Sequence, residues 1–179
     1  GGTEPVLGTN PISAAFPAGK GQVLVDLSTS AITNGQLRLA AQEGRSIPEG
    51  CAIGPDGRLT TDPAEARKGS VLPFGGHKGY ALSVMVQIFS GALVRGAPVP
   101  DSGGNYGIFM LAISPSVFMD SETFQEAVAE LVDRLKSADR AEGVSEILVP
   151  GERAFRDREI RAREGIEVDE VLLEALKRL

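Results

Sequence analysis

The chain has 179 residues, of which 42% are hydrophobic, so it is long enough to bury one core. Its 18 Lys and Arg against 24 Asp and Glu give a formal net charge of -6, and no basic run is long enough to clamp a nucleic-acid backbone. The longest uncharged apolar stretch, residues 79–94, is shorter than the roughly 20 residues that cross a bilayer, so neither nucleic acid nor a membrane is an expected partner.

The N-terminal residues lack the positive start and the apolar middle of a secretory signal, which favours a cytoplasmic location. The first clear element is a strand at residues 22–27, where three apolar residues precede Asp26. We expect Ser30 to cap a helix at residues 31–43, which ends before Gly44. The sequence therefore predicts a strand followed by a capped helix.

Residues 47–73 are rich in turn-forming residues and contain few apolar residues that could set a period. We therefore expect a long irregular connection with room for one helical turn at residues 63–68, and such connections are usually either functional or disordered. A glycine-rich turn then leads into an apolar helix at residues 79–94, which we expect to be buried nearly all round.

Residues 106–114 are apolar on both faces, as in a central strand of a sheet. Nearer the C-terminus, we expect a short strand at residues 146–149 and a last helix at residues 169–179.

Between these elements the pattern predicts one amphipathic helix with a single apolar stripe. It begins at Asp120 or Ser121, and Thr123 with Glu126 offers an alternative start at capping-box spacing.

The glycine turn at residues 75–79 has the physics of an anion site. Backbone N–H groups and the positive end of the helix dipole point outward together, and Lys78 adds a mobile positive charge. The chain contains neither G-x-x-x-x-G-K-[ST] nor G-x-G-x-x-G, which argues against a P-loop and against an ordinary Rossmann site. From spacing alone, a phosphate-binding turn and a plain helix-entry turn remain equal alternatives.

His77 is the only imidazole, so any acid–base histidine within this chain must be this one. No carboxylate is close to it in sequence, which favours a packing or cofactor contact over a catalytic base. A hydrolase built on Ser28 or Ser30 with His77 is disfavoured, because the sequence signals no strained nucleophile turn. Cys51 has no neighbouring base and, with one histidine, cannot complete a structural zinc site, so no metal is expected.

Asp26 ends an apolar strand and precedes a cluster of hydroxyl residues, at a place where strands often present functional groups. The alternative is that Asp26 caps the following helix and that the serines are ordinary cap residues. The residues alone leave both roles open.

Five short segments, taken in their order along the chain, form a recognisable pattern. They are GTNP at residues 8–11, VDLSTSAITNG at 25–35, GRLTTDPAEA at 57–66, LPFGGHKGYALSV at 72–84 and PGE at 150–152. Together they resemble the malate/L-lactate dehydrogenase family, which also contains ureidoglycolate, sulfolactate and diketogulonate enzymes and a cyclic imino acid reductase. The resemblance implies hydride transfer between NAD or NADP and a small 2-oxo or 2-hydroxy acid, and it leaves the acid and the choice of dinucleotide open.

The resemblance also implies a fold and an assembly. The expected fold is α/β, with a mixed, largely antiparallel sheet flanked by helices, and the expected assembly is a homodimer. Within the chain we expect an NAD(P)-binding domain at residues 1–143, followed by a C-terminal strand and helical segment at residues 144–179.

By the same analogy, eight residues are expected to contact the cofactor: Asp26, Ser28, Thr29, Ser30, His77, Lys78, Gly151 and Glu152. Asp26 is also the expected catalytic carboxylate. It would orient the family's proton-transferring histidine, because a carboxylate bound to one ring nitrogen fixes the tautomer and stabilises the imidazolium.

The chain departs from the family pattern at several points. Cys51 stands where a tryptophan is common, Gly54 where an aspartate is common, and Gln87 where an acidic residue is frequent. The chain also resembles the C-terminal portion of the pattern, so the segment with the catalytic histidine and a substrate-binding arginine is expected outside it. Alone it should hold cofactor poorly and transfer hydride slowly. The alternative is a non-catalytic remnant that binds a nucleotide or a partner subunit through an exposed apolar patch.

Overall fold

The structure, a computed structural model, describes residues 2–99, 105–168 and 170–178. Its strands are β1 (Ile12–Ala18), β2 (Gly21–Leu27), β3 (Ala52–Ile53) and β4 (Ser70–Val71). Its helices are α1 (Asn34–Gln42), α2 (Pro63–Lys68), α3 (His77–Gln87), the π-helix η1 (Ile88–Leu93), the 3-10 turn η2 (Pro115–Val117), α4 (Ser121–Lys136), α5 (Glu152–Glu164) and α6 (Glu170–Leu176). The predicted α/β class with antiparallel sheets is confirmed, and the sheets of the described residues are the pairs β1–β2 and β3–β4.

Contacts divide the chain into two compact units. The first contains residues up to Ala14 together with Asp26–Ser114, and the second contains Ala15–Val25 and the residues from Pro115 onward. These bounds differ from those of the two predicted regions, 1–143 and 144–179, whose independence as domains stays a prediction.

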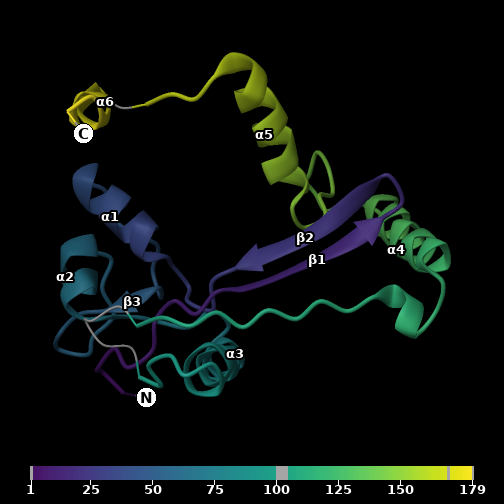
Figure 1. Cartoon of the computed structure of the whole chain (residues 1–179). Coiled ribbons are helices and arrows are strands. Elements are labelled where there is room, and N and C mark those ends of the chain that lie inside the picture. Colours follow the sequence, from purple (N-terminus) through teal and green to yellow (C-terminus); the bar gives the residue numbers. More distant parts are fainter. Residues whose placement is uncertain (1, 100–104, 169, 179) are drawn as a thin grey trace. The chain divides into compact units, whose positions relative to one another are not determined.

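Strands β1 and β2 form a hairpin that turns at Gly19 and Lys20. Figure 1 shows the two strands running in opposite directions. Strand β2 confirms the predicted strand at residues 22–27, and the residues that follow it form the loop that leads to α1.

Helix α1 begins later than predicted, and its N-cap is Thr33. The Thr33 hydroxyl accepts a hydrogen bond from the Gln36 N–H at 3.2 Å, and Gln36 Oε1 accepts one from the Thr33 N–H at 2.9 Å. This reciprocal pair is a capping box. The prediction that Ser30 caps this helix is therefore wrong, because Ser30 lies beside Pro73 in an isolated β-bridge.

The hydrophobic core of the first unit draws heavily on residues 47–73. Its buried apolar residues are Ile32, Leu37, Ala40, Ile47, Ala52 and Ala66. The predicted helical turn at residues 63–68 is confirmed as α2, with Asp62 as its N-cap and Pro63 at its first position. Apart from α2 and the two-residue strands β3 and β4, the segment is irregular as expected, and its buried residues Ile47, Ala52 and Ala66 anchor it in the core.

Helix α3 and η1 together replace the single predicted helix at residues 79–94. The expectation that this helix is buried nearly all round is wrong. In α3, Gly79 and Ser83 are buried, whereas Tyr80 is 58% exposed and Ile88 of η1 is also exposed.

Residues 106–114 form an extended segment, which Figure 1 shows as a long stretch between α3 and α4. The predicted central strand is wrong, because no described residue pairs with this segment in a β-ladder. Its apolar side chains are exposed, and Met110 reaches 83%. The segment has the apolar composition of a buried strand, but the described residues contain no strand that pairs with it.

Helix α4 of the second unit begins at the predicted residue. Asp120 is its N-cap, and one carboxylate oxygen accepts hydrogen bonds from the N–H groups of Glu122 and Thr123 at 3.1 and 2.9 Å. The alternative start at Thr123 and Glu126 is therefore wrong.

The rest of the second unit differs more from the prediction. Residues 146–149 do not form the predicted strand in the described structure, although the Leu24 N–H of β2 donates to the Pro150 carbonyl at 3.2 Å. Helix α5 is absent from the predicted elements, because its alternating Arg and Glu residues show no clear apolar stripe. Helix α6 confirms the last predicted helix, whose expected ends at residues 169 and 179 lie outside the described residues.

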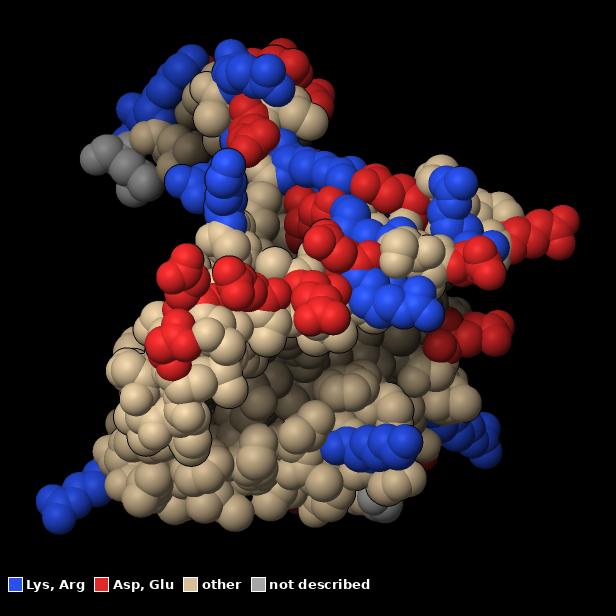
Figure 2. Space-filling view, turned by 90° about the vertical axis from the view of Figure 1, so that its right-hand side faces the viewer, with Lys and Arg blue, Asp and Glu red and all other residues tan. Residues whose placement is uncertain are grey.

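No helix in the described ranges has both the length and the apolar character needed to cross a bilayer. In the same ranges, no group of three or more His, Cys, Asp and Glu side chains gathers as metal ligands would. Figure 2 shows acidic and basic side chains intermingled over part of the visible face.

Candidate functional site

The three residues that follow Leu27 form a loop that their own hydroxyl groups hold in place. Ser28 Oγ and Thr29 Oγ1 both donate to the Thr9 carbonyl, at 3.0 and 3.1 Å, and the Thr29 N–H donates to it at 3.0 Å. Ser30 Oγ donates to the Ile32 carbonyl at 2.8 Å. Thr29 is 1% exposed, and its two neighbours are half-buried. Residues 28–30, the hydroxyl loop, are thus anchored on Thr9.

The glycine turn bends the chain into α3. Gly75 and Gly76 have φ angles of 55° and 60°, and the Gly79 N–H donates to the Phe74 carbonyl at 3.1 Å. A Cβ on Gly79 would lie 2.1 Å from that carbonyl oxygen, so this position requires glycine. The His77 N–H makes no hydrogen bond within the described part of the chain and is available to a ligand. Residues 75–78 are called the amide bend.

Lys78 places an exposed side chain at the start of α3. Its ammonium forms no ion pair with any described residue, whereas Lys68 on α2 is paired with Glu65 at 2.8 Å. A free ammonium beside an open amide, at the positive end of a helix dipole, attracts an anion such as a phosphate.

Backbone hydrogen bonds hold the hydroxyl loop and the amide bend next to each other. The Phe74 N–H donates to the Thr29 carbonyl at 3.1 Å, and the Ala31 N–H donates to the Leu72 carbonyl at 2.7 Å. The structure thus brings Ser28, Thr29 and Ser30 together with His77 and Lys78 in one unit.

Asp26 is the second-last residue of strand β2 and is exposed. It does not cap the following helix, since Thr33 does, so the alternative role as a cap is wrong. His77 is likewise exposed, as the first residue of α3. The orienting role of Asp26 and the cofactor contact of His77 stay predictions.

Gly151 and Glu152 belong to the second unit, where they open α5. Gly151 has a φ of 88°, and a Cβ there would lie 2.8 Å from Leu24 Cβ, so packing on β2 requires glycine. The Glu152 carboxylate accepts from Lys136 Nζ at 2.6 Å and from Arg156 at 2.5 Å. The hydrogen bond from Lys136 lowers the pKa of Glu152. Both residues have structural roles in this unit, and their cofactor contacts stay predictions.

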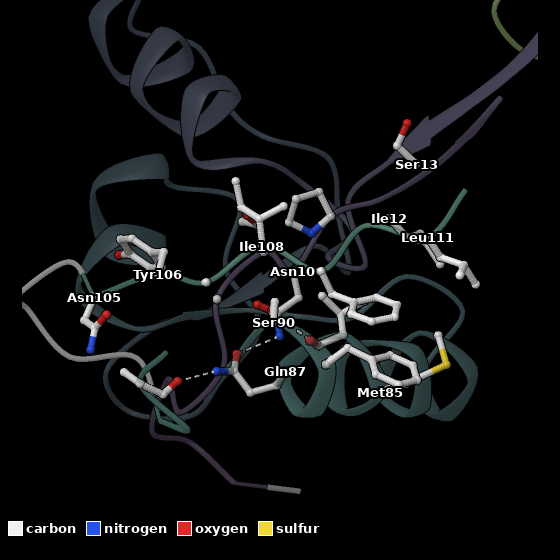
Figure 3. Close-up of a pocket in the computed structure, with 18 of the residues that line it drawn as sticks. Asn10, Ile12, Ser13, Met85, Gln87, Ser90, Asn105, Tyr106, Ile108 and Leu111 are labelled. Atoms are coloured by element: carbon white, nitrogen blue, oxygen red, sulfur yellow. Dashed lines mark hydrogen bonds between the residues drawn. The ribbon is translucent and has the colours of Figure 1, made fainter. Parts of the chain in front are cut away.

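A cavity of about 670 Å³ lies in the first unit. Its walls come from residues 8–13, from α3 and η1, and from residues 105–111, with Asn34 at one side. The rings of Phe89 and Phe109 stack on one wall with centroids 4.9 Å apart. Figure 3 shows the polar side chains of Asn10 and Gln87 directed toward each other beside the cavity. None of the predicted site residues lines it.

The side chains that line the cavity are all uncharged. Carboxylate recognition usually relies on Arg or Lys, so the cavity suits an uncharged group better than the carboxylate end of an acid.

The sequence prediction assigned no role to Thr9 or Asn10, which lie at the centre of this region. Both belong to the GTNP motif, and Asn10 has a φ of 38°, which asparagine adopts more readily than most residues. A signal was present, because the polar residues Ser83 and Gln87 interrupt the apolar helix at a spacing of four.

The chemical groups of the amide bend are of the kinds that bind the pyrophosphate of a dinucleotide. They offer an open N–H and a free ammonium, and the space where a Cβ on Gly75 or Gly76 would lie is open. The hydroxyls of the hydroxyl loop are occupied by the chain itself, so they shape the site more than they donate to a ligand.

Comparison with known proteins gives consistent matches over nearly the whole chain. The family model described as malate/L-lactate dehydrogenase matches residues 1–177. The malate/(S)-sulfolactate dehydrogenase of Methanothermus fervidus is 43% identical, over 100% of this chain and 54% of its own length. The Delta(1)-pyrroline-2-carboxylate reductase of Ancylobacter novellus is 38% identical over the same shares.

A solved structure agrees with these matches. The sulfolactate dehydrogenase from Methanocaldococcus jannaschii superimposes with a TM-score of 0.83 and 41% identity, over 99% of this chain and 53% of that one. The chain thus spans about half the length of the relatives that it matches, and the part of the family pattern that it represents stays a prediction. The resemblance noted in the motifs is confirmed, and the chain belongs to the malate/L-lactate dehydrogenase family.

Proposed function

We propose that this chain binds the nicotinamide dinucleotide of an oxidoreductase that acts on small 2-hydroxy or 2-oxo acids. The observation that carries the proposal is the free Lys78 ammonium beside the open His77 N–H, joined through Phe74 to the hydroxyl loop. Family membership supports it, because the similar proteins are named as dehydrogenases or reductases of small acids.

Each part of the site has a defined task in this proposal. The bound dinucleotide supplies or accepts the hydride. Lys78 and the His77 N–H hold its negative charge, while the hydroxyl loop fixes the neighbouring backbone. Asp26 orients the imidazole that moves the proton, a histidine that the resemblance places outside this chain.

Fluorescence titration of the chain with NADH and with NADPH tests the proposal. Lys78→Ala removes the free charge and is expected to weaken binding about tenfold. The matched control Lys68→Ala removes a lysine that Glu65 already engages, and its affinity should stay within about twofold of wild type. Equal affinities for all three proteins, or no binding by wild type at millimolar dinucleotide, would contradict the proposal. The same titration decides between NAD and NADP.

The finer parts of the proposal concern the complete protein. We propose a cytoplasmic homodimer whose substrate is a malate-, lactate- or sulfolactate-like acid. Assays with the corresponding 2-oxo acids, in the presence of a polypeptide that carries the rest of the family's length, test the substrate class. Turnover of none of them by a mixture that binds dinucleotide would contradict it.

A second candidate function is assembly without catalysis, and the exposed segment 106–113 favours it. Its apolar side chains are uncovered in the first unit, as Met110 illustrates, and the chain spans 54% of a relative's length. The proposed occupant is a polypeptide with the remaining part of that length. Met110→Lys should abolish the complex in size-exclusion chromatography, while Leu59→Lys, at an apolar position that is 67% exposed, should not. A complex that forms without 2-oxo acid turnover would favour assembly over catalysis.

A further inference from the structure

The side chain of Asn10 binds α3 through its amide nitrogen. Asn10 Nδ2 donates to the Ser83 carbonyl at 3.0 Å, to Ser83 Oγ at 3.2 Å and to Gln87 Oε1 at 3.1 Å. Gln87 Nε2 in turn donates to the Ala97 carbonyl at 3.0 Å. Figure 3 shows Asn10 and Gln87 joined in this chain of hydrogen bonds at the edge of the cavity.

The donor and acceptor roles in this series of hydrogen bonds are fixed at both ends. Backbone carbonyls can only accept hydrogen bonds, so the atom of Asn10 that faces the Ser83 carbonyl must be its amide nitrogen. The same reasoning requires Gln87 to present its nitrogen to Ala97 and its oxygen to Asn10. A carboxylate at position 10 would therefore face acceptors at the Ser83 carbonyl and at Gln87 Oε1.

Asn10 also belongs to a closed series of contacts that includes the hydroxyl loop and the amide bend. The adjacent Thr9 carbonyl anchors the hydroxyl loop, and the Thr29 carbonyl accepts from the Phe74 N–H at the entry of the amide bend. The bend opens α3, and Ser83 on α3 returns the series to Asn10. A change at Asn10 therefore acts on both segments at once.

We propose that Asn10 is a positioning residue that sets the placement of the hydroxyl loop relative to the amide bend. It touches no reacting atom in this role and acts through the Thr9 carbonyl and through α3. Its effect on nucleotide affinity rests on the proposed function, whereas its effect on the two segments does not.

Hydrogen–deuterium exchange tests the placement without any ligand. Asn10→Asp keeps the shape and the tolerance for a positive φ, but it removes the donor, so exchange at residues 28–30 and 74–79 should become about tenfold faster. Asn10→Gly, which keeps the backbone angle accessible without a side chain, should act in the same direction. The control Gln36→Glu makes the same amide-to-acid change where Oε1 only accepts, and exchange should stay unchanged.

NADH binding at two pH values separates positioning from a loss of stability. At about pH 8, Asn10→Asp should bind NADH about tenfold more weakly than wild type. The acceptors that face position 10 disfavour a charged carboxylate and should raise its pKa above the ordinary value of about 3.9, so at about pH 5 the carboxyl should be partly protonated, regain a donor and recover part of the affinity. Asn10→Gly should stay weak at both. Measurement of wild type at both pH values corrects for the other titratable side chains of this unit, which include Tyr106 on the cavity and His77 at the start of α3.

The outcomes are distinct. Faster exchange confined to the two segments, with recovery of affinity at low pH, supports the proposal. Unchanged exchange overturns it, and so does an equal acceleration throughout the first unit, including α1, which would indicate a general loss of stability. If wild type binds neither NADH nor NADPH, the proposed function fails, and the exchange result alone decides the role of Asn10.

Discussion

Thr29 combines nearly complete burial with a fully used polar side chain. Its hydroxyl donates to the Thr9 carbonyl, which also accepts from Ser28 and from the Thr29 backbone. The motif containing Thr29 could be identified from the sequence, but its partner could not, because Thr9 is 20 residues away and binds through its backbone. Sequence patterns locate such loops but do not identify backbone acceptors.

Thr29→Val should therefore destabilise the first unit although its shape is nearly unchanged. It removes one hydrogen bond from a residue that is 1% exposed, and we expect the free energy of unfolding to fall by about 1 kcal/mol in urea denaturation. Thr29→Ser keeps the hydroxyl and serves as the control. A Val variant as stable as wild type would show that this hydroxyl contributes nothing.

At the scale of elements, local signals succeeded where a side chain caps a helix. Asp120 caps α4 as the sequence predicted, and Asp62, directly before the predicted helical turn, caps α2. Ser30 failed because the decisive feature was a pair, Thr33 with Gln36, rather than a single hydroxyl residue. The missed helix α5 is held at its N-terminal end by ion pairs with distant residues, which no local period reveals.

The capping box of α1 gives a direct test at this scale. Thr33→Ala removes the acceptor for the Gln36 N–H and should lower the free energy of unfolding by about 1 kcal/mol. Gln36→Glu keeps the acceptor for the Thr33 N–H and places negative charge at a helix N-terminus, so it should be neutral or slightly stabilising. Urea denaturation monitored by circular dichroism measures both, and a larger loss for Gln36→Glu would contradict the assignment.

The ion cluster that joins α4 and α5 predicts a dependence of stability on pH. Arg156 donates to both oxygens of Glu146, at 2.6 and 2.5 Å, and this hydrogen bonding lowers the pKa of Glu146 from 4.5 to about 2. A lowered carboxyl pKa stabilises the fold above its ordinary value, and the contribution is lost as the pH falls toward the folded pKa. Stability of the second unit should therefore decline between about pH 4.5 and pH 2.

Glu146→Gln should reduce that decline, because it removes one of the two carboxylates of the cluster whose pKa is lowered, the other being Glu152. Glu142→Gln, at an exposed residue outside the cluster, is the control and should decline as wild type does. Thermal unfolding followed across this pH range measures the difference. Identical profiles for wild type and Glu146→Gln would show that the cluster does not couple folding to pH.

At the scale of the whole molecule, the positions of apolar residues were predicted better than their burial. The core around Leu37 is buried, whereas α3 and residues 106–113 expose apolar side chains that their composition placed in a core. The physical reason is that the burial of a side chain depends on which residues lie across the surface from it. Composition cannot supply that partner.

A cavity in the core of the first unit should lower the stability of that unit and leave the stability of the second unit unchanged. Leu37 is 1% exposed, so Leu37→Ala should lower the stability of the first unit by about 2–5 kcal/mol. Leu39→Ala, on the exposed face of the same helix, should cost less than about 1 kcal/mol. Hydrogen exchange resolved by segment measures both units, and equal acceleration in α1 and α4 would contradict the division into two units.

The most direct test of the account is to map where NADH protects backbone amides from exchange. The account predicts protection at residues 28–30 and 75–79, lost in Lys78→Ala and retained in Lys68→Ala. Protection confined to the uncharged cavity around residues 106–111, with the amide bend unaffected, would contradict it.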